Sequence, residues 1–100
     1  MEPIFHIAAQ PTWEAAVAVG EYAQSTRDQT LDEVGFIHCS YRRQVDGVLA
    51  NFYADVTEPL VLLTIDPDRV QRRIQVDDGF PHIYGPLNTD AVVEVAPIYA

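Results

Sequence analysis

The sequence has no lysine, and its only cations are six arginines against fifteen acidic residues, which gives a formal net charge of -9. The absence of lysine excludes Schiff-base chemistry at a lysine amine and the phosphate-binding lysine of a P-loop. The excess of negative charge argues against a general DNA- or RNA-binding surface and against adhesion to anionic lipids, since both need clustered positive charge. Any anion site must therefore be built from arginine or from backbone N–H groups.

Cysteine and long apolar stretches are equally scarce. Cys39 is the only cysteine, so no internal disulfide can form. No apolar run approaches the roughly 20 residues that a membrane-spanning helix needs, and no targeting segment opens the chain. These features predict a cytoplasmic protein with no membrane partner.

What the sequence does contain is the composition of a globular domain. Its 100 residues are 48% hydrophobic and 21% charged, which is enough apolar material for one core. Neither a repeat nor a compositional shift marks a linker. We expect a single domain over residues 1–100.

The hydrophobic pattern predicts an α+β fold with two main helices and a mostly antiparallel sheet. One helix begins at Thr12 as N-cap and ends at Gly20, and a longer one begins at Ser40 as N-cap. The first helix buries a stripe of Trp13, Ala16 and Val17, and the second buries its apolar positions from Tyr41 to Phe52. Residues 21–33 are expected to form a loop, with a turn of helix as the alternative within it. Strands are expected over residues 4–8, 34–39, 60–66, 72–77 and 91–95, the last ended by Pro97.

The first candidate site is the junction between the second strand and the second helix. His38 lies at the end of the strand, Ser40 caps the helix, and Arg42 and Arg43 follow in its first turn. Free N–H groups at a helix start, with two arginines beside them, can hold a small phosphate or carboxylate. The alternative is an ordinary capped helix whose arginines lie in solvent.

The second candidate is the aromatic segment over residues 80–87, where two prolines and a glycine stiffen the chain around His82 and Tyr84. Rigid segments that carry an imidazole and aromatic rings often line ligand pockets. Packing of these rings in the core explains the same pattern. A metal site is not indicated, because the histidines are 32 and 44 residues apart and form no close ligand pair.

Three motifs together resemble a known family. His6 stands in Ile-Phe-His-Ile at residues 4–7, His38 in Gly-Phe-Ile-His-Cys-Ser at residues 35–40, and His82 in Phe-Pro-His-Ile-Tyr-Gly-Pro-Leu at residues 80–87. In this order and spacing they resemble a bacterial family catalogued as domain of unknown function 952. The resemblance covers nearly the whole chain and implies a small ADP-ribosyltransferase-like fold, in which a split, curved sheet forms a cleft that holds NAD in the active enzymes.

The same resemblance implies a set of site residues. Together with Arg42 and Arg43 of the first candidate site, His6, Ser40, His82 and Tyr84 would bind NAD, ADP-ribose or another small phosphate-bearing ligand, with His38 and Glu94 as catalytic groups for glycosyl or ADP-ribosyl transfer. Glu94 is the only acid on the last strand available for the transferase glutamate, but its neighbours form no recognisable acid motif. Binding is thus favoured over transfer, and the alternative is a non-catalytic interaction module in which the histidines are structural.

Overall fold

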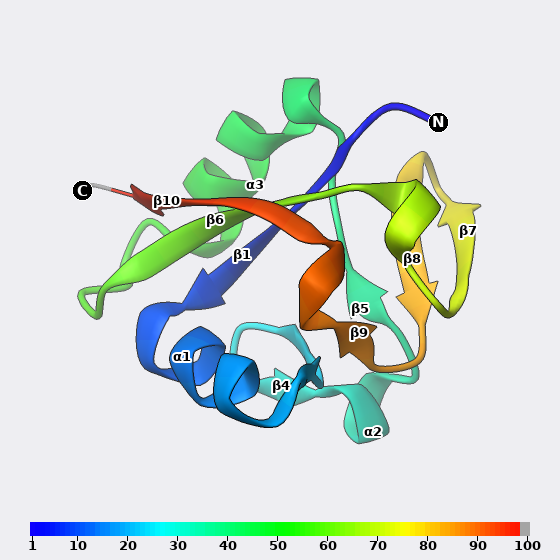
Figure 1. Cartoon of the computed structure of the whole chain (residues 1–100). Helices are drawn as coiled ribbons and strands as arrows, with labels where there is room; N and C mark the ends of the chain where they lie inside the picture. Colours follow the sequence, from blue (N-terminus) through cyan, green and yellow to red (C-terminus); the bar gives the residue numbers. More distant parts are fainter. Residues whose placement is uncertain (99–100) are drawn as a thin grey trace.

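The computed structural model describes residues 1–98 (Figure 1). The α+β fold and the antiparallel pairing are confirmed, since each strand pair in this part of the chain is antiparallel. No helix within residues 1–98 is long and apolar enough to span a membrane. The helices are α1 (Gln10–Val19), α2 (Leu31–Val34) and α3 (Val45–Phe52), and the strands are β1 (Ile4–Ala9), β2 (Glu21–Tyr22), β3 (Gln24–Thr26), β4 (Gln29–Thr30), β5 (Ile37–His38), β6 (Leu60–Ile65), β7 (Arg73–Asp77), β8 (Phe80–Tyr84), β9 (Leu87–Asn88) and β10 (Val92–Ile98).

The longest strands form a sheet in the order β1-β6-β10. The central strand β6 is apolar on both alternations because both of its faces are covered. Val61, Leu63 and Ile65, on one face of β6, belong to a large core cluster that includes Trp13 and Ala16 of α1. Leu62, on the other face, packs in a smaller cluster with Val48 of α3. The two main helices therefore cover opposite faces of this sheet.

A second sheet has the order β5-β8-β7 and carries two of the histidines. His38 on β5 lies directly opposite His82 on β8 in the register. The two sheets are joined where Phe5 on β1 exchanges backbone hydrogen bonds with Ser40, each N–H donating to the other's carbonyl over 2.8 Å. This bridge brings the end of β5 against β1.

The predicted N-caps are both wrong. The helix α1 begins at Gln10 with Ala9 in the cap position, three residues before the expected cap Thr12, because Pro11 suits the first turn of a helix. Ser40 caps no helix, since its backbone is committed to Phe5, and a 3₁₀ turn over Arg42–Gln44 precedes α3 instead. Gly20 does end α1, in a left-handed conformation with φ of 87°.

Several other expectations are corrected by the structure. The expected loop at residues 21–33 contains the short strands β2, β3 and β4, and the turn of helix that the sequence left open there is α2. The expected strand at residues 34–39 is reduced to β5, because α2 extends to Val34 and Gly35 ends it with a φ of 98°. The segment at residues 80–87 is mainly strand, with Pro81 inside β8 and its carbonyl accepting from the Cys39 N–H. Pro97 lies within β10, an edge strand, where a missing N–H is tolerated.

The predicted helix faces are correct only in part. Trp13 and Ala16 are buried, but Val17 is 53% exposed. In α3, Val45 and Val48 are buried, whereas Phe52 at the end of the helix is 60% exposed. The exposed ring of Phe52 lines a groove together with His38.

Candidate functional site

The centre of the candidate site is a pair of imidazole rings on neighbouring strands. Because His38 and His82 occupy opposite positions on β5 and β8, their side chains leave the same face of the sheet. The Nδ1 atom of His38 lies 3.1 Å from Nε2 of His82. The antiparallel register therefore joins two residues that are 44 positions apart in the sequence.

Asp77, at the end of β7, extends this pair into a chain of hydrogen bonds. The Nδ1 of His82 lies 2.8 Å from a carboxylate oxygen of Asp77, and the Tyr84 hydroxyl donates to the same oxygen. Hydrogen bonds from Tyr84, then from Gln75 and His82, hold the pKa of Asp77 below its ordinary value. The same interaction with Asp77 raises the pKa of the Tyr84 hydroxyl. Asp77 is therefore the ionised end of the chain.

The partners of each ring nitrogen determine where the protons lie. An ionised carboxylate only accepts, so His82 carries a proton on Nδ1, and when its ring is uncharged it presents an unprotonated Nε2 to His38. His38 then donates from Nδ1, which leaves its own Nε2 as a free lone pair. Burial, and then the nearby His82, lower the pKa of His38. At neutral pH His38 is therefore an uncharged ring with one nitrogen able to accept a proton.

Aromatic contacts hold the two imidazole rings in place. Phe36 stacks on His82 with ring centres 3.9 Å apart and an interplanar angle of 14°. Phe80 lies against His38, with ring centres 5.3 Å apart. Packed rings have little freedom to leave the geometry that the hydrogen bonds require.

His38 opens onto a groove of about 420 Å³ between the short strands after α1 and the helix α3. Its walls combine apolar side chains with a few polar groups, a composition typical of small-molecule sites. Ser25 is fully buried at this groove, and its hydroxyl has no hydrogen-bond partner among the described residues. The lining residues are Ser25, Thr26, Arg27, Gln29, Val34, Phe36, His38, Val48 and Phe52.

Arg27 is the one guanidinium that lines the groove, and it is already paired. One of its amino groups donates to Asp55 over 2.6 Å and to the Phe52 carbonyl over 3.1 Å. The Arg27 side chain is 35% exposed and that of Asp55 is 78% exposed, so water screens this pair and a ligand can compete for it.

His6 lies behind the groove and does not line it. It is 3% exposed, and its Nδ1 lies 2.6 Å from the His38 carbonyl, while its Nε2 lies 2.8 Å from the Tyr22 hydroxyl. Burial lowers the pKa of His6 to about 4. The three histidines are thus consecutive in space, but only the backbone of His38 connects His6 to the other two.

The remaining predicted residues lie outside the groove lining. Ser40 is 4% exposed and occupied with Phe5. Arg43 lies 3.5 Å from Glu2 and over the Tyr41 ring, and Arg42 lies beside Phe5. Glu94 is exposed on β10 and lies opposite Thr64 of β6, in the sheet that does not carry His38 and His82. The structure therefore unites His38, His82 and Tyr84 and leaves His6, Ser40, Arg42, Arg43 and Glu94 apart from them.

Sequence reasoning missed Asp77, Phe36, Ser25 and Arg27. Asp77 was visible only as one of many acids in an alternating strand, and its role depends on the register of β7 with β8. Cys39, between two motif residues, is fully buried, and burial raises the pKa of its thiol. Within residues 1–98, no group of three His, Cys, Asp or Glu side chains is arranged to hold a metal ion.

Comparison with known proteins places this geometry in a family. A family model described as "Protein of unknown function (DUF952)" matches residues 7–95. The chain belongs to the DUF952 family. The match includes the strand positions of His38, His82 and Asp77, and the description of the family names no activity. No curated protein matches the chain.

Three solved structures of one protein match this chain along nearly its full length. The crystal structure of protein CC0527 from Caulobacter crescentus has a TM-score of 0.82 and 26% sequence identity, covering 98% of this chain and 87% of that one. A crystal structure of a double mutant of CC0527 has a TM-score of 0.78 and 30% identity over the same shares of the two chains. The solution structure has a TM-score of 0.70 and 28% identity, covering 96% and 84%. This chain is therefore similar in fold to CC0527.

Proposed function

We propose that the groove beside His38 binds a small ligand with a flat ring and a phosphate group, of the NAD or ADP-ribose kind, and that His38 is its acid–base group. The observation that carries the proposal is the hydrogen-bonded chain from Asp77 through His82 to His38, which ends in an unprotonated nitrogen on a residue that lines the groove. A neutral imidazole with an oriented second nitrogen is the usual arrangement of a general base.

The chain supports proton transfer because it holds the His38 ring in one orientation before and after the transfer. When Nε2 takes a proton from a ligand, the new positive charge lies next to a nitrogen that His82 keeps as an acceptor. The negative charge of Asp77 at the far end of the chain favours this imidazolium electrostatically. A positioned base of this kind contributes typically 10²–10⁴-fold to a rate.

The shape of the groove supports a ring-bearing ligand. Phe36, Val34, Val48 and Phe52 supply apolar surface for a nicotinamide or adenine ring. At about 30 Å³ per water molecule, a groove of about 420 Å³ holds roughly fourteen waters. It therefore accommodates one half of a dinucleotide, and the rest would extend over the surface.

The phosphate would be bound by Arg27. This requires the guanidinium to exchange Asp55 for the ligand, and a phosphate, like a carboxylate, offers two oxygens to the two amino groups of an arginine. Under this proposal His82 and Tyr84 are positioning residues that act through His38, and Glu94, Arg42 and Arg43 have no part. A nucleotide ligand also agrees with the cytoplasmic location that the sequence predicts.

Titration calorimetry with NAD, ADP-ribose, AMP and nicotinamide tests the proposal. We expect at least one of the phosphate-bearing compounds to bind, and His38→Asn to weaken it at least tenfold. Asparagine keeps a donor toward His82 but has no nitrogen in the place of Nε2. A second variant, Arg27→Ala, tests the phosphate contact. Its matched control is Arg69→Ala, because Arg69 is an exposed arginine paired with Asp66 outside the groove. Absence of binding by all four compounds at about 1 mM would overturn the proposal.

A non-catalytic module remains the second candidate, because all three histidines make hydrogen bonds within the protein. In that case His38→Asn lowers the free energy of unfolding and no ligand stabilises either protein. A thermal-unfolding series with and without ligand separates the two, since a pocket residue changes the ligand-induced shift in Tm, whereas a structural residue changes the Tm of the free protein.

A further inference from the structure

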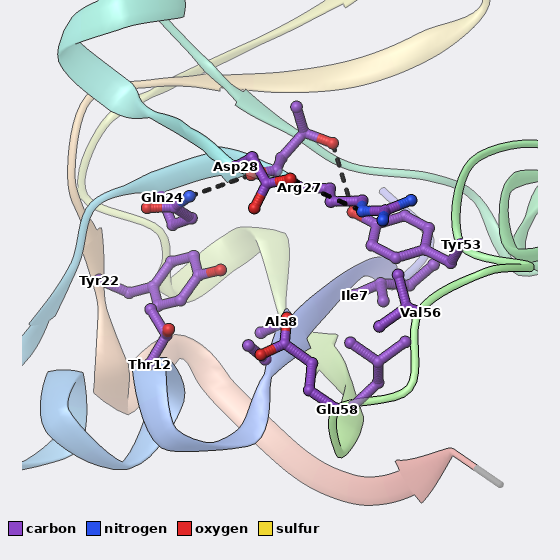
Figure 2. A pocket seen from close by; sticks show the side chains of 13 residues that line it. Ile7, Ala8, Thr12, Tyr22, Gln24, Arg27, Asp28, Tyr53, Val56 and Glu58 are labelled. Carbon is purple, nitrogen blue, oxygen red and sulfur yellow. Dashed lines mark hydrogen bonds and ion pairs between the residues drawn. The ribbon is translucent and has the colours of Figure 1, made fainter. Parts of the chain in front are cut away.

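A second cavity, of about 210 Å³, is lined by residues of β1, β2 and β3, by Thr12 in the first turn of α1 and by the segment after α3 (Figure 2). It shares only Thr26 and Arg27 with the His38 groove. Its polar residues converge on one space, with the Tyr22 hydroxyl and the Glu58 carboxylate both directed toward its centre (Figure 2). Its lining residues are Ile7, Ala8, Ala9, Thr12, Tyr22, Gln24, Thr26, Arg27, Asp28, Tyr53, Val56, Glu58 and Leu60.

The proton of the Tyr22 hydroxyl is not available to a ligand. The Nδ1 of His6 faces the His38 carbonyl at 2.6 Å and must be an N–H donor. Its Nε2 is then a lone pair, so the Tyr22 hydroxyl donates to it over 2.8 Å. Burial keeps His6 uncharged at neutral pH, with a pKa of about 4. Tyr22, which is 1% exposed, therefore offers the cavity only the lone pairs of its oxygen.

Two other donors of the cavity are partly occupied. One N–H of the Gln24 side-chain amide donates to the Thr26 carbonyl over 3.1 Å, which leaves the amide oxygen and the second N–H. The guanidinium of Arg27 is engaged by Asp55 and by the Phe52 carbonyl. The groups left for a ligand include the oxygens of Tyr22 and Gln24 and the carboxylates of Asp28 and Glu58.

The charge of the lining residues favours a positively charged ligand. Asp28 and Glu58 contribute two carboxylates against the single guanidinium of Arg27. That guanidinium is further neutralised by Asp55. The net charge of -9 on the whole chain adds a field that attracts cations.

We propose that this cavity binds a small organic cation, a primary alkylammonium. An ammonium group brings three donors, a positive charge and no acceptor, which matches the oxygens of Tyr22, Asp28 and Glu58. A sugar or other polyol would bring no charge to offset the two carboxylates. Ile7, Val56 and Leu60 supply apolar contacts for a short alkyl chain, and tyrosine rings attract cations through their faces. A volume of about 210 Å³ corresponds to roughly seven waters, which limits the ligand to a few carbons beside its amine.

The test is a titration of the ¹⁵N-labelled protein at low ionic strength with three probes of similar size: propylammonium chloride, 1-propanol and D-ribose. We expect propylammonium to give saturable shifts in the amide signals of Ala8, Ala9 and residues 24–27, and 1-propanol and ribose to give none. Saturable binding of ribose or of 1-propanol at these signals would overturn the proposal, because either is uncharged. Absence of saturation with propylammonium at about 10 mM would overturn it as well.

A pair of matched variants separates the cavity from the acidic surface. Glu58→Gln removes one charge from the lining, while Glu14→Gln removes one charge from the exposed side of α1 outside the lining. We expect Glu58→Gln to weaken propylammonium at least tenfold, as for loss of a hydrogen bond to a charged group, and Glu14→Gln to change the affinity less than twofold. Equal weakening by the two variants would mean a general attraction of cations to the surface and would overturn the proposed site.

Discussion

Protonation of His6 is expected to make the stability of this protein fall steeply between neutral and mildly acidic pH. His6 is 3% exposed, and burial lowers its pKa from 6.5 to about 4. In the unfolded chain the ring takes up a proton as the pH falls through 6.5, whereas in the folded protein it stays neutral until about pH 4. The unfolded state therefore binds more protons in this window, so the free energy of unfolding is greatest above it and decreases as the pH falls.

The size of the effect follows from the two pKa values of His6. One proton taken up over one pH unit is worth about 1.36 kcal/mol, so the window from 6.5 to about 4 corresponds to roughly 3 kcal/mol. Between pH 7 and about pH 4.5 the free energy of unfolding falls by about 2 kcal/mol, because this interval does not cover the whole titration of His6. That is a large part of the 5–15 kcal/mol that holds a typical domain folded.

Urea unfolding followed by the fluorescence of the single Trp13, which is buried, measures this loss across the pH series. The comparison is His6→Gln, which retains a donor toward the His38 carbonyl and an acceptor for Tyr22 but does not titrate. His6→Gln lowers stability at pH 7, and its stability should then fall by about 2 kcal/mol less than that of the wild type on going to about pH 4.5.

Other titrating groups do not obscure the comparison. The pKa of His38 is also lowered, by burial first, so part of the pH dependence persists in His6→Gln. Carboxylates with lowered pKa values, such as Asp77, lose their contribution at lower pH and do so in both proteins. The reasoning would be refuted if the wild type and His6→Gln lost equal stability over this interval.

Three further outcomes are expected. Leu63→Ala, at a fully buried position of β6, should lower the free energy of unfolding by about 2–5 kcal/mol in urea, whereas Val95→Ala, 43% exposed on β10, should change it by less than about 0.5 kcal/mol; equal effects would contradict the assigned core. Cys39 should not react with an aromatic disulfide reagent until the protein unfolds, since its thiol is buried with a raised pKa, and rapid labelling of the native protein would count against this. Gly85→Ala should lower the free energy of unfolding by about 1 kcal/mol or more, because φ at Gly85 is 149° and a Cβ there would lie 2.8 Å from Cγ of Arg72. Removing the Arg72 side chain as well should relieve this contact but not the backbone strain. Full recovery of stability in the double variant would therefore contradict a backbone cause.

The elements that sequence reasoning predicted well are those with long, regular patterns. The strand β6 has apolar residues at every position from Leu60 to Leu63, and such a run has one stable solution in a domain of this size, a strand covered on both faces. Gly20 is a local signal of the same strength, because a left-handed residue after a helix favours glycine. Strands of two residues, such as β4, have no period to detect and exist only because a partner strand is beside them.

The failure at Ser40 has a related cause. A serine before a run of helical periodicity is an N-cap signal, yet the backbone of Ser40 is taken by Phe5, 35 residues away. A long-range pair of backbone hydrogen bonds outweighs one side-chain cap. The anion site expected with Arg42 and Arg43 loses its basis for the same reason, since no helix begins at Ser40.

By itself the sequence determined the chemical character of this protein. A lysine-free chain with a net charge of -9 has few cations, and its motifs concentrate three imidazoles on short apolar segments. Alternation along the strand also separates the side chains of His38 and Cys39, because neighbours point to opposite faces. These conclusions depend only on composition and local geometry.

Only the tertiary structure decided which of these groups act together. The register of β5, β8 and β7 aligns His38, His82 and Asp77, and burial behind them isolates His6 with Tyr22. Register is a property of paired strands and burial is a property of the packed whole, so neither can be read from one segment. The role of the arginines also depends on tertiary structure, because Arg27, which stood in no motif, is the arginine that lines both cavities.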